Sequence, residues 1–329
     1  MKVHILDDWL DTLRGLPCFA KLDGHAVTVW TDHVSDPAVL ADRVKEAEAL
    51  VLFRERSAIT DALLARLPNL KLISQRGAHP HVDVAACTRH GVLLCTKLPN
   101  PAGGKPNFAA AELTWGLILA AMRQIPQQMA SLKAGQWQMG VGKSLRGRTL
   151  GLYGYGQIAG AVATVAEAFG VKVVWWASET GRDRARAAGA TVATSREAFF
   201  AESDIVSLHV RLKPNTTGLI TAQDLALMGP DSLLVNTSRA GLIAPGALLA
   251  TLEAGRPGMA AIDVFDAEPL TDPSDPLLNH PNLIATPHIG FVTLDEFDKQ
   301  FSDIFNQINA FADGQPMNMI NPEVWTTAS

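Results

Sequence analysis

The sequence is poor in cysteine, with three residues (Cys18, Cys87 and Cys95) among 329 and no CxxC pair. An odd number of widely spaced cysteines excludes a disulfide framework and a zinc knuckle. We therefore expect free thiols in a reducing compartment, which favours a cytoplasmic protein. His79 and His81 have no cysteine or carboxylate at ligand spacing, so no metal site is predicted.

The sequence also lacks an excess of positive charge and a long apolar run. Lysine and arginine total 28 against 33 acidic residues, a formal net charge of −5. A surface that follows nucleic-acid phosphates needs clustered positive charge, so we expect no nucleic-acid partner. The amino terminus is too acidic for a secretory signal. The most apolar long stretch, 108–122, contains Glu112 and is too short to span a bilayer, so we expect no membrane partner.

What the chain does contain is a regular alternation of short apolar runs and helical patterns. The runs lie at 3–6, 26–30, 49–53, 70–74 and 92–95, and then at 149–153, 171–176, 191–193, 205–208, 232–236, 259–264 and 283–285. Apolar strands that alternate with helices are typical of βαβ units, which build a parallel sheet with helices on both faces. The length suits two such domains.

The alternation breaks at 98–106, where three prolines and two glycines predict a loop or hinge. A long helix is expected next, over 107–123, followed by a shorter helix over 124–135. A final amphipathic helix is expected over 293–312. The two α/β series differ in length and no tandem repeat is present.

The sharpest local motif is the glycine-rich stretch 151–160, which follows an apolar strand and leads into a helical pattern over 161–169. This is the context of a dinucleotide-binding turn. Gly154 permits the tight turn, Gly156 lets a pyrophosphate approach the backbone, and Ala159 stands at the third position. The amino terminus of the following helix would then face the phosphates. Glycine-rich turns without a ligand also occur, but the matched context favours cofactor binding.

The next strand should end in an acidic residue if the cofactor is NAD. Instead it ends in Ala177 and Ser178, and the first acid is Glu179. No arginine follows immediately to bind a 2′-phosphate, although Arg182 and Arg184 are near in sequence. The sequence therefore predicts NAD or NADP, with NAD favoured.

Polar residues recur where later strands end. Arg239, Asp263 and His288 each lie at or just past a predicted strand, and Glu268 follows shortly after Asp263. Ligands of open parallel sheets bind beyond the carboxyl ends of the strands, so these side chains should converge. Arginine can grip a carboxylate, and a carboxylate can orient a histidine that moves a proton. Each residue alone has an ordinary structural explanation, and only the set favours catalysis.

With these motifs in place, the sequence resembles the D-isomer-specific 2-hydroxyacid dehydrogenase family over almost the whole chain. The stretches that carry the resemblance are 151–160, 204–210, 234–241, 261–270 and 286–290. The resemblance implies two doubly wound parallel-sheet α/β domains. A Rossmann NAD(P)-binding domain, 101–292, would be inserted into a flavodoxin-like substrate domain made of 1–100 and 293–329. It also implies a homodimer formed through the helix at 107–122.

The family pattern implies a catalytic triad of Arg239, Glu268 and His288. The cofactor contacts it implies are Gly154, Gly156, Gln157, Ile158, Ser178, His209, Thr237, Asp263 and Gly290. Gly77, Ala78 and His79 fall in the loop that would bind the substrate carboxylate together with Arg239. Two departures from the family pattern are His79, where a glycine is expected, and Arg211, where proline is common.

The implied activity is hydride transfer between a nicotinamide cofactor and a small 2-oxo acid or D-2-hydroxy acid. His288 would give or take the proton, and Glu268 would keep it charged and aligned. The formate-oxidising branch of the family has glutamine in place of Glu268, so that chemistry is not expected here. An alternative is a corepressor-like binding protein that senses the dinucleotide with little turnover. A hydrolase of adenosyl thioethers is a distant third, since it would need further length and substrate residues.

Overall fold

The computed structural model describes residues 1–98 and 108–326. The chain divides into two compact units, which are considered separately. Unit 1 comprises Met1–Gly104 and Thr293–Ser329, and unit 2 comprises Lys105–Val292. The predicted hinge at 98–106 lies, apart from Leu98, outside the described residues.

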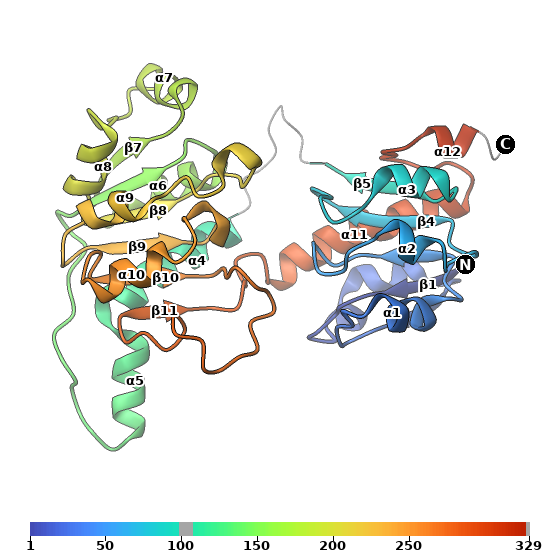
Figure 1. Ribbon diagram of the computed structural model, residues 1–329, viewed down its shortest axis with the longest axis horizontal. Helices are drawn as coiled ribbons and strands as arrows, with labels where there is room; N and C mark the ends of the chain where they lie inside the picture. Colours follow the sequence, from blue (N-terminus) through green and yellow to red (C-terminus); the bar gives the residue numbers. More distant parts are fainter. Residues whose placement is uncertain (99–107, 327–329) are drawn as a thin grey trace. The chain divides into compact units, whose positions relative to one another are not determined.

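Unit 1 is built on a five-stranded parallel sheet in the order β2-β1-β3-β4-β5 (Figure 1). Its strands are β1 (Lys2–Ile5), β2 (Ala26–Val29), β3 (Ala49–Val51), β4 (Leu72–Arg76) and β5 (Leu93–Lys97). The helices are α1 (Pro37–Val44), α2 (Asp61–Leu64), α3 (Val84–Arg89), α11 (Leu294–Ala312) and α12 (Glu323–Thr326), with 3₁₀ turns at Leu13–Gly15 and Pro17–Leu22. Buried side chains of α1, α2 and α3 share one core with the sheet.

Local sequence explains where the helices of unit 1 begin. The side chains of Asp36, Thr60 and Asp83 accept hydrogen bonds from backbone N–H groups in the first turns of α1, α2 and α3. Thr293 caps α11 in the same way. The buried face of α11 carries Phe297, Phe301, Ile304, Phe305 and Ile308, whose spacing is that of one helical stripe. The last helix therefore completes unit 1, although it is remote in sequence.

Unit 2 contains a six-stranded parallel sheet in the order β11-β10-β9-β8-β6-β7. Its strands are β6 (Thr149–Tyr153), β7 (Lys172–Trp176), β8 (Ile205–Leu208), β9 (Leu233–Asn236), β10 (Met259–Ile262) and β11 (Leu283–Ala285). The helices are α4 (Ala109–Arg123), α5 (Ile125–Lys133), α6 (Gln157–Ala168), α7 (Glu179–Ala187), α8 (Arg196–Glu202), α9 (Ala222–Leu227) and α10 (Ala247–Glu253), with 3₁₀ turns at Pro214–Thr216 and Ala240–Leu242. One core joins α4 and α6 to the sheet and another joins α8, α9 and α10 to it.

The two sheets confirm the predicted fold class of two doubly wound parallel sheets. Unit 1 has the flavodoxin-like strand order. Unit 2 has the Rossmann order, with β6 as the first strand and the reversal between β6 and β8. In such sheets the ligand site lies at the carboxyl ends of the strands where the order reverses. The loops after β6 and β8 are therefore the place to look in unit 2.

One predicted strand, at 191–193, is wrong as an element. The structure has only an isolated parallel bridge there, between Trp175 and Val192. The N–H of Trp175 donates to the carbonyl oxygen of Thr191, and the N–H of Ala193 donates to that of Trp175. The chain then turns away, because Ser195 caps α8 only two residues later. The segment occupies the third-strand position of a Rossmann sheet, but it is too short to form a ladder.

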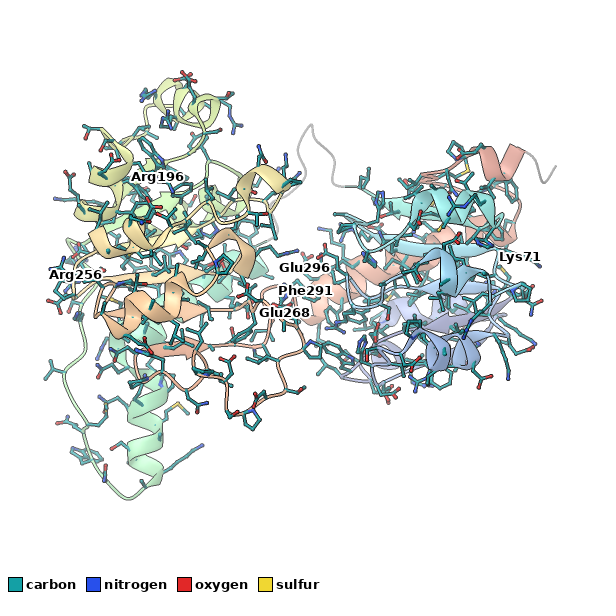
Figure 2. All side chains as sticks on the ribbon, in the orientation of Figure 1. Lys71, Arg196, Arg256, Glu268, Phe291 and Glu296 are labelled. Atoms are coloured by element: carbon teal, nitrogen blue, oxygen red, sulfur yellow. The ribbon has the colours of Figure 1, made fainter. Side chains whose placement is uncertain are left out.

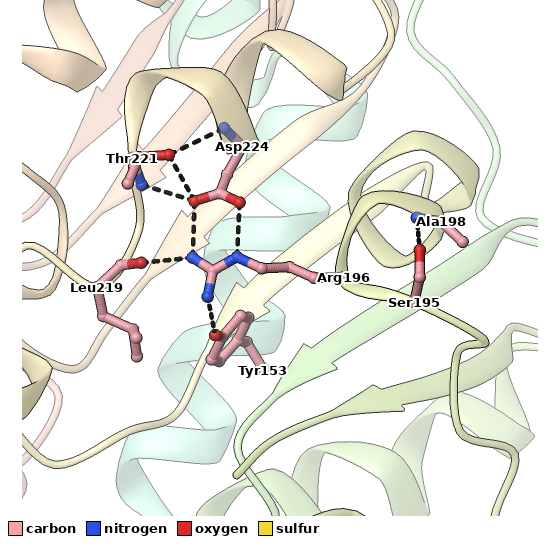
Figure 3. A network of polar contacts seen from close by, with 7 residues as sticks. All are labelled: Tyr153, Ser195, Arg196, Ala198, Leu219, Thr221 and Asp224. Atoms are coloured by element: carbon pink, nitrogen blue, oxygen red, sulfur yellow. Dashed lines mark hydrogen bonds and ion pairs between the residues drawn. The ribbon is translucent and has the colours of Figure 1, made fainter. Parts of the chain in front are cut away.

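A charged network joins α8, α9 and the end of β6 (Figure 3). The Nε and Nη2 atoms of Arg196 each lie 2.7 Å from a different carboxylate oxygen of Asp224, and Nη1 lies 2.9 Å from the Tyr153 hydroxyl. Asp224 also forms a capping box with Thr221 at the start of α9. Burial alone would raise the pKa of Asp224, but the hydrogen bonds from Arg196 and Thr221 hold it below 3.8.

We expect Asp224→Asn to lower the free energy of unfolding of unit 2 by about 2–3 kcal/mol, because it leaves a largely buried guanidinium without its counter-charge. Since the folded-state pKa of Asp224 is depressed, this contribution is present above pH 4 or so and is lost as the pH falls through the lowered pKa. Urea denaturation at neutral pH measures the loss of stability in the variant, and the same experiment at acidic pH measures how the contribution of Asp224 depends on pH. The matched control is Asp183→Asn, which removes an exposed pair with Arg186 and should change stability by less than about 0.5 kcal/mol. Equal losses in the two variants would contradict this account.

Candidate active site

The glycine turn after β6 is shaped by a close approach of two backbone segments. Gly154 has φ = +115°, and a Cβ atom on it would lie 2.3 Å from the carbonyl oxygen of His209. The N–H of Gly154 donates to the carbonyl oxygen of Trp176 at 2.7 Å. Only glycine combines this φ with this approach. The turn is therefore clamped between the ends of β7 and β8.

The second glycine of the turn leaves space. Gly156 is the N-cap residue of α6, and no heavy atom lies within 4 Å of the position a Cβ atom would take. No side chain caps α6. The N–H groups of its first turn therefore face the open space without a hydrogen bond to a capping side chain. Gln157 and Ile158 begin the helix and are exposed, whereas Ala159 is fully buried. Open space in front of an uncapped helix amino terminus fits a pyrophosphate.

His209 follows β8 and faces the same turn. Its N–H donates to the carbonyl oxygen of Tyr153 at 2.8 Å, and its Nε2 lies 2.9 Å from the Ser207 hydroxyl. Burial lowers the pKa of His209 to about 4. The imidazole is therefore neutral at neutral pH, and it adds no charge beside the turn.

Asp263 organises the loop that carries His288. It is fully buried just after β10, and its carboxylate accepts hydrogen bonds from the Thr286 hydroxyl at 2.6 Å and from the N–H groups of Ile289 and Gly290, each at 2.8 Å. Burial raises the pKa of Asp263 above 3.8, and these hydrogen bonds only partly offset that. A Cβ atom on Gly290 would lie 3.1 Å from this carboxylate. The loop is therefore closed tightly around one buried acid.

The predicted acid–histidine pair is present. His288 Nδ1 lies 2.6 Å from Glu268 Oε2, and the other oxygen of Glu268 accepts from the N–H of Phe265 at 2.9 Å. His288 has φ = +54°, a left-handed conformation that non-glycine residues rarely adopt, and its N–H donates to the carbonyl oxygen of Thr286. Strain of this kind persists where the surrounding structure enforces it, often at functional sites.

Charge around this pair favours an ionised carboxylate. Burial alone would raise the pKa of Glu268, but the hydrogen bonds from His288 and from Phe265, with the charges of His288 and Arg239, lower it below 4.5. The ring of Phe291 meets the His288 ring edge-on at 5.7 Å. Figure 2 labels Glu268 and Phe291 on these loops of unit 2. Glu268 therefore carries its negative charge throughout the neutral pH range.

The loop that carries Arg239 is held by Asn236, which sequence reasoning did not single out, and by Thr237. Asn236 is buried at the end of β9; its Nδ2 donates to the carbonyl oxygen of Arg239 at 2.9 Å, and its Oδ1 accepts from the N–H of Ser238. The hydroxyl of Thr237 lies 2.8 Å from that of Thr114 on α4. The only sequence signal for this role of Asn236 was that a polar residue stands at the end of a buried strand.

The remaining predicted site residues are Ser178 of unit 2 and three residues of unit 1. Ser178 caps α7 by accepting a hydrogen bond from the N–H of Gly181. Gly77, Ala78 and His79 belong to unit 1, just after β4. Gly77 has φ = +96°, and its N–H donates to the carbonyl oxygen of Lys97. Their role as a carboxylate-binding loop stays a prediction.

No cluster of three or more histidine, cysteine or acidic side chains suited to a metal ion occurs within residues 1–98 and 108–326. The three cysteines are free and buried. No helix in the described part of the chain combines the length and the apolarity needed to cross a membrane.

The fold of unit 2 and its open glycine turn define the class of dinucleotide-binding α/β proteins. The model of the D-isomer specific 2-hydroxyacid dehydrogenase NAD-binding domain matches residues 115–290, all within unit 2. The chain belongs to the D-isomer specific 2-hydroxyacid dehydrogenase family, as its motifs predicted.

Relatives of known name match over nearly the whole chain. The glyoxylate reductase of Thermococcus litoralis is 31% identical over 92% of this chain and 93% of its own. That of Aeropyrum pernix is 34% identical over 91% and 90%. The crystal structure of a phosphoglycerate oxidoreductase from Vibrio cholerae is 45% identical, covers 95% of this chain and 99% of its own, and superposes with a TM-score of 0.88.

The glycine turn gives a prediction that separates folding from binding. Gly156→Ala should leave the free energy of unfolding within about 1 kcal/mol of wild type, because its backbone is ordinary and its surroundings are open. It should nevertheless weaken dinucleotide binding at least about tenfold, because the new methyl group occupies the space of the pyrophosphate. Calorimetric titration and urea denaturation measure the two effects.

Gly154→Ala is the companion variant. It should destabilise unit 2 by at least about 2 kcal/mol, since the backbone conformation is strained for alanine and the His209 carbonyl is in the way. A Gly156→Ala protein that binds the dinucleotide as tightly as wild type would show that the turn does not hold a pyrophosphate.

Proposed function

We propose that this protein is an oxidoreductase that transfers a hydride between a nicotinamide dinucleotide and a 2-oxo acid or D-2-hydroxy acid. The observation that carries the proposal is the 2.6 Å contact between His288 and the ionised Glu268, with Arg239 close enough to lower the pKa of that carboxyl. These groups follow β9, β10 and β11 of the sheet whose β6 carries the glycine turn. Family membership supports the same reaction class.

The residues of unit 2 that would hold the dinucleotide are those of the glycine turn and the first turn of α6. Gly154 and Gly156 would let the pyrophosphate approach, and Gln157 and Ile158 would present their N–H groups. His209, Thr237, Asp263 and Gly290 remain proposed contacts of the same ligand. When bound, the nicotinamide ring accepts or donates the hydride.

The side chains divide the remaining work in the reductive direction. Arg239 would bind the substrate carboxylate through its planar fork and polarise the adjacent carbonyl. His288 would donate its Nε2 proton to the carbonyl oxygen as that oxygen gains charge. Glu268 holds Nδ1 of the same ring, which fixes its orientation and favours the protonated form. Gly77, Ala78 and His79 are the proposed second contact for the carboxylate.

We expect His288→Asn to lower the rate of 2-oxo acid reduction by about 10²–10⁴-fold while dinucleotide affinity stays within about threefold, because asparagine tolerates the left-handed backbone but cannot relay the proton. The assay follows loss of reduced-nicotinamide absorbance with glyoxylate, hydroxypyruvate, pyruvate or phenylpyruvate. His280→Asn, which changes an imidazole whose ring accepts from the nearby Asn282 N–H, is the control and should keep wild-type activity.

The outcome of that panel also separates the two functions. Saturable dinucleotide binding with no turnover on any 2-oxo acid would contradict the enzyme and favour the dinucleotide-sensing alternative. Equal rates in wild type and His288→Asn would remove His288 from the mechanism.

We expect Glu268→Gln to change the pH dependence as well as the rate. The hydrogen bonds from His288 and Phe265 lower the pKa of Glu268, so this carboxylate is ionised throughout the neutral range. Removing the charge but keeping an acceptor should cause the reductive rate to fall with rising pH earlier than in wild type. An unchanged pH–rate profile would contradict the role given to Glu268.

We also propose that the protein is a homodimer, and that the contact is made by α5 and the segment after it. No residue of α5 is buried. Large apolar side chains are exposed at Ile125, Met129, Leu132, Trp137, Met139 and Val141, with Trp137 exposed to 77% and Val141 to 92%. Figure 1 shows α5 projecting from the body of its unit. By contrast, α4, in which the sequence placed the dimer contact, buries most of its apolar residues within its own unit.

Leu132→Asp should therefore convert a dimer to a monomer, because it places a charge in the apolar contact. Light scattering after size-exclusion chromatography measures the mass. Leu227→Asp, at an isolated exposed leucine on α9, should leave the mass unchanged. A wild-type protein that is monomeric at micromolar concentration would contradict the proposal.

A further inference from the structure

The end of β7 lies directly against the glycine turn. Tyr153 of β6 is the register partner of Trp176 of β7, and the Gly154 N–H donates to the Trp176 carbonyl oxygen. Tyr155 lies between the two glycines of the turn. Its Cβ atom is 3.8 Å from the position that a Cβ atom on Gly181 of α7 would take. A dinucleotide whose pyrophosphate sits on the turn therefore places its adenosine ribose against the residues that follow β7.

The side chain expected at this strand end for NAD is absent. An aspartate or glutamate there accepts hydrogen bonds from the ribose hydroxyls and excludes a 2′-phosphate by its charge. Here the strand is followed by Ala177, which is 7% exposed, and by Ser178, whose hydroxyl caps α7. Glu179 comes later, as the first residue of α7. The strand end itself carries no negative charge.

Two guanidinium groups are anchored at this place instead. Nη1 of Arg182 donates to the carbonyl oxygen of Ala177 at 2.7 Å, and its guanidinium lies 4.3 Å from the centre of the Trp176 ring. Nη2 of Arg184 donates to the carbonyl oxygen of Tyr155 at 2.9 Å. One arginine is thus fixed to the strand end and the other to the glycine turn.

Each of these two guanidinium groups lies over an aromatic ring, Arg182 over Trp176 and Arg184 over Tyr155 at 5.5 Å, but no described carboxylate pairs with either. Over residues 1–98 and 108–326, neither guanidinium has a carboxylate within 4.0 Å, whereas Arg186 pairs with Asp183 at 2.9 Å. A guanidinium offers five N–H donors, and one donor of each is accounted for by the backbone carbonyl. The remaining donors and the planar fork suit a phosphate group.

Resting on the function proposed above, we infer that Arg182 and Arg184 form a binding site for the 2′-phosphate of the adenosine ribose, so that this protein uses NADP(H) in preference to NAD(H). The sequence alone left NAD and NADP open, with NAD favoured. The missing carboxylate at Ala177 and the two anchored arginines reverse that preference. Because Ala177 stands where an acid would be, no carboxylate repels the 2′-phosphate at the strand end, and the two arginines attract it.

The test uses probes that carry the ribose phosphate without the nicotinamide. Calorimetric titration of the full chain with 2′,5′-ADP and with 5′-AMP compares ligands that differ only in the 2′-phosphate. We expect 2′,5′-ADP to bind at least about tenfold tighter, the scale of a charge-assisted hydrogen bond. Arg182→Gln and Arg184→Gln should each reduce that ratio by about three- to tenfold and leave 5′-AMP affinity unchanged. Ala177→Asp should weaken 2′,5′-ADP more than 5′-AMP.

Arg186→Gln is the matched control, since it removes the neighbouring arginine that already has a carboxylate partner, and it should not change the ratio.

Binding of 5′-AMP as tight as that of 2′,5′-ADP, or no binding of 2′,5′-ADP, overturns the inference. Turnover with NADH but not NADPH would also overturn it while leaving the proposed function intact. A preference for 2′,5′-ADP with no reduction of any 2-oxo acid would support the site and contradict the proposed function.

Discussion

The loop that carries His288 depends on one buried carboxylate. Asp263 accepts three hydrogen bonds from a single loop, and no water competes for it because it is fully buried. An ion in that position is costly unless its donors are complete, so the loop has one stable conformation. That conformation fixes His288 at a positive φ and presents its ring to Glu268. The geometry of the His288–Glu268 pair is thus secured by the buried Asp263 beneath it.

At the glycine turn, the geometry is set by contacts of the backbone rather than of side chains. Gly154 lies between the carbonyl oxygens that end β7 and β8, and the approach of His209 leaves no room for a side chain. Desolvation lowers the pKa of His209 to about 4 and keeps it neutral, so the turn gains rigidity without local charge. Arg182 and Arg184, further along the chain, supply positive charge at the end of β7 and at the turn. Shape and charge are therefore supplied by different residues.

Much of this was predictable because the relevant signals are local or repeat along the chain. Strand and helix alternation fixed the fold class, and glycine spacing located the turn. Arg239, Glu268 and His288 were singled out because they lie past the ends of strands, and the structure brings His288 and Glu268 to 2.6 Å from each other. The part played by Asn236 was missed, since a residue that holds a loop has no motif of its own. The strand predicted at 191–193 failed because pairing depends on where the chain turns next, which an apolar run does not show.

The sequence by itself determined which residue types stand at the ends of which strands, and hence the class of chemistry, because parallel strands bring their carboxyl ends to one edge. Only the tertiary structure decided which partners those residues take. It placed the carboxylate of Asp263 under the histidine loop, and it turned Arg182 toward the end of β7 and Arg184 toward the glycine turn. It also left the apolar side chains of α5 uncovered within the described residues. Such choices depend on distances between segments far apart in the chain, and no pattern of neighbouring residues encodes them.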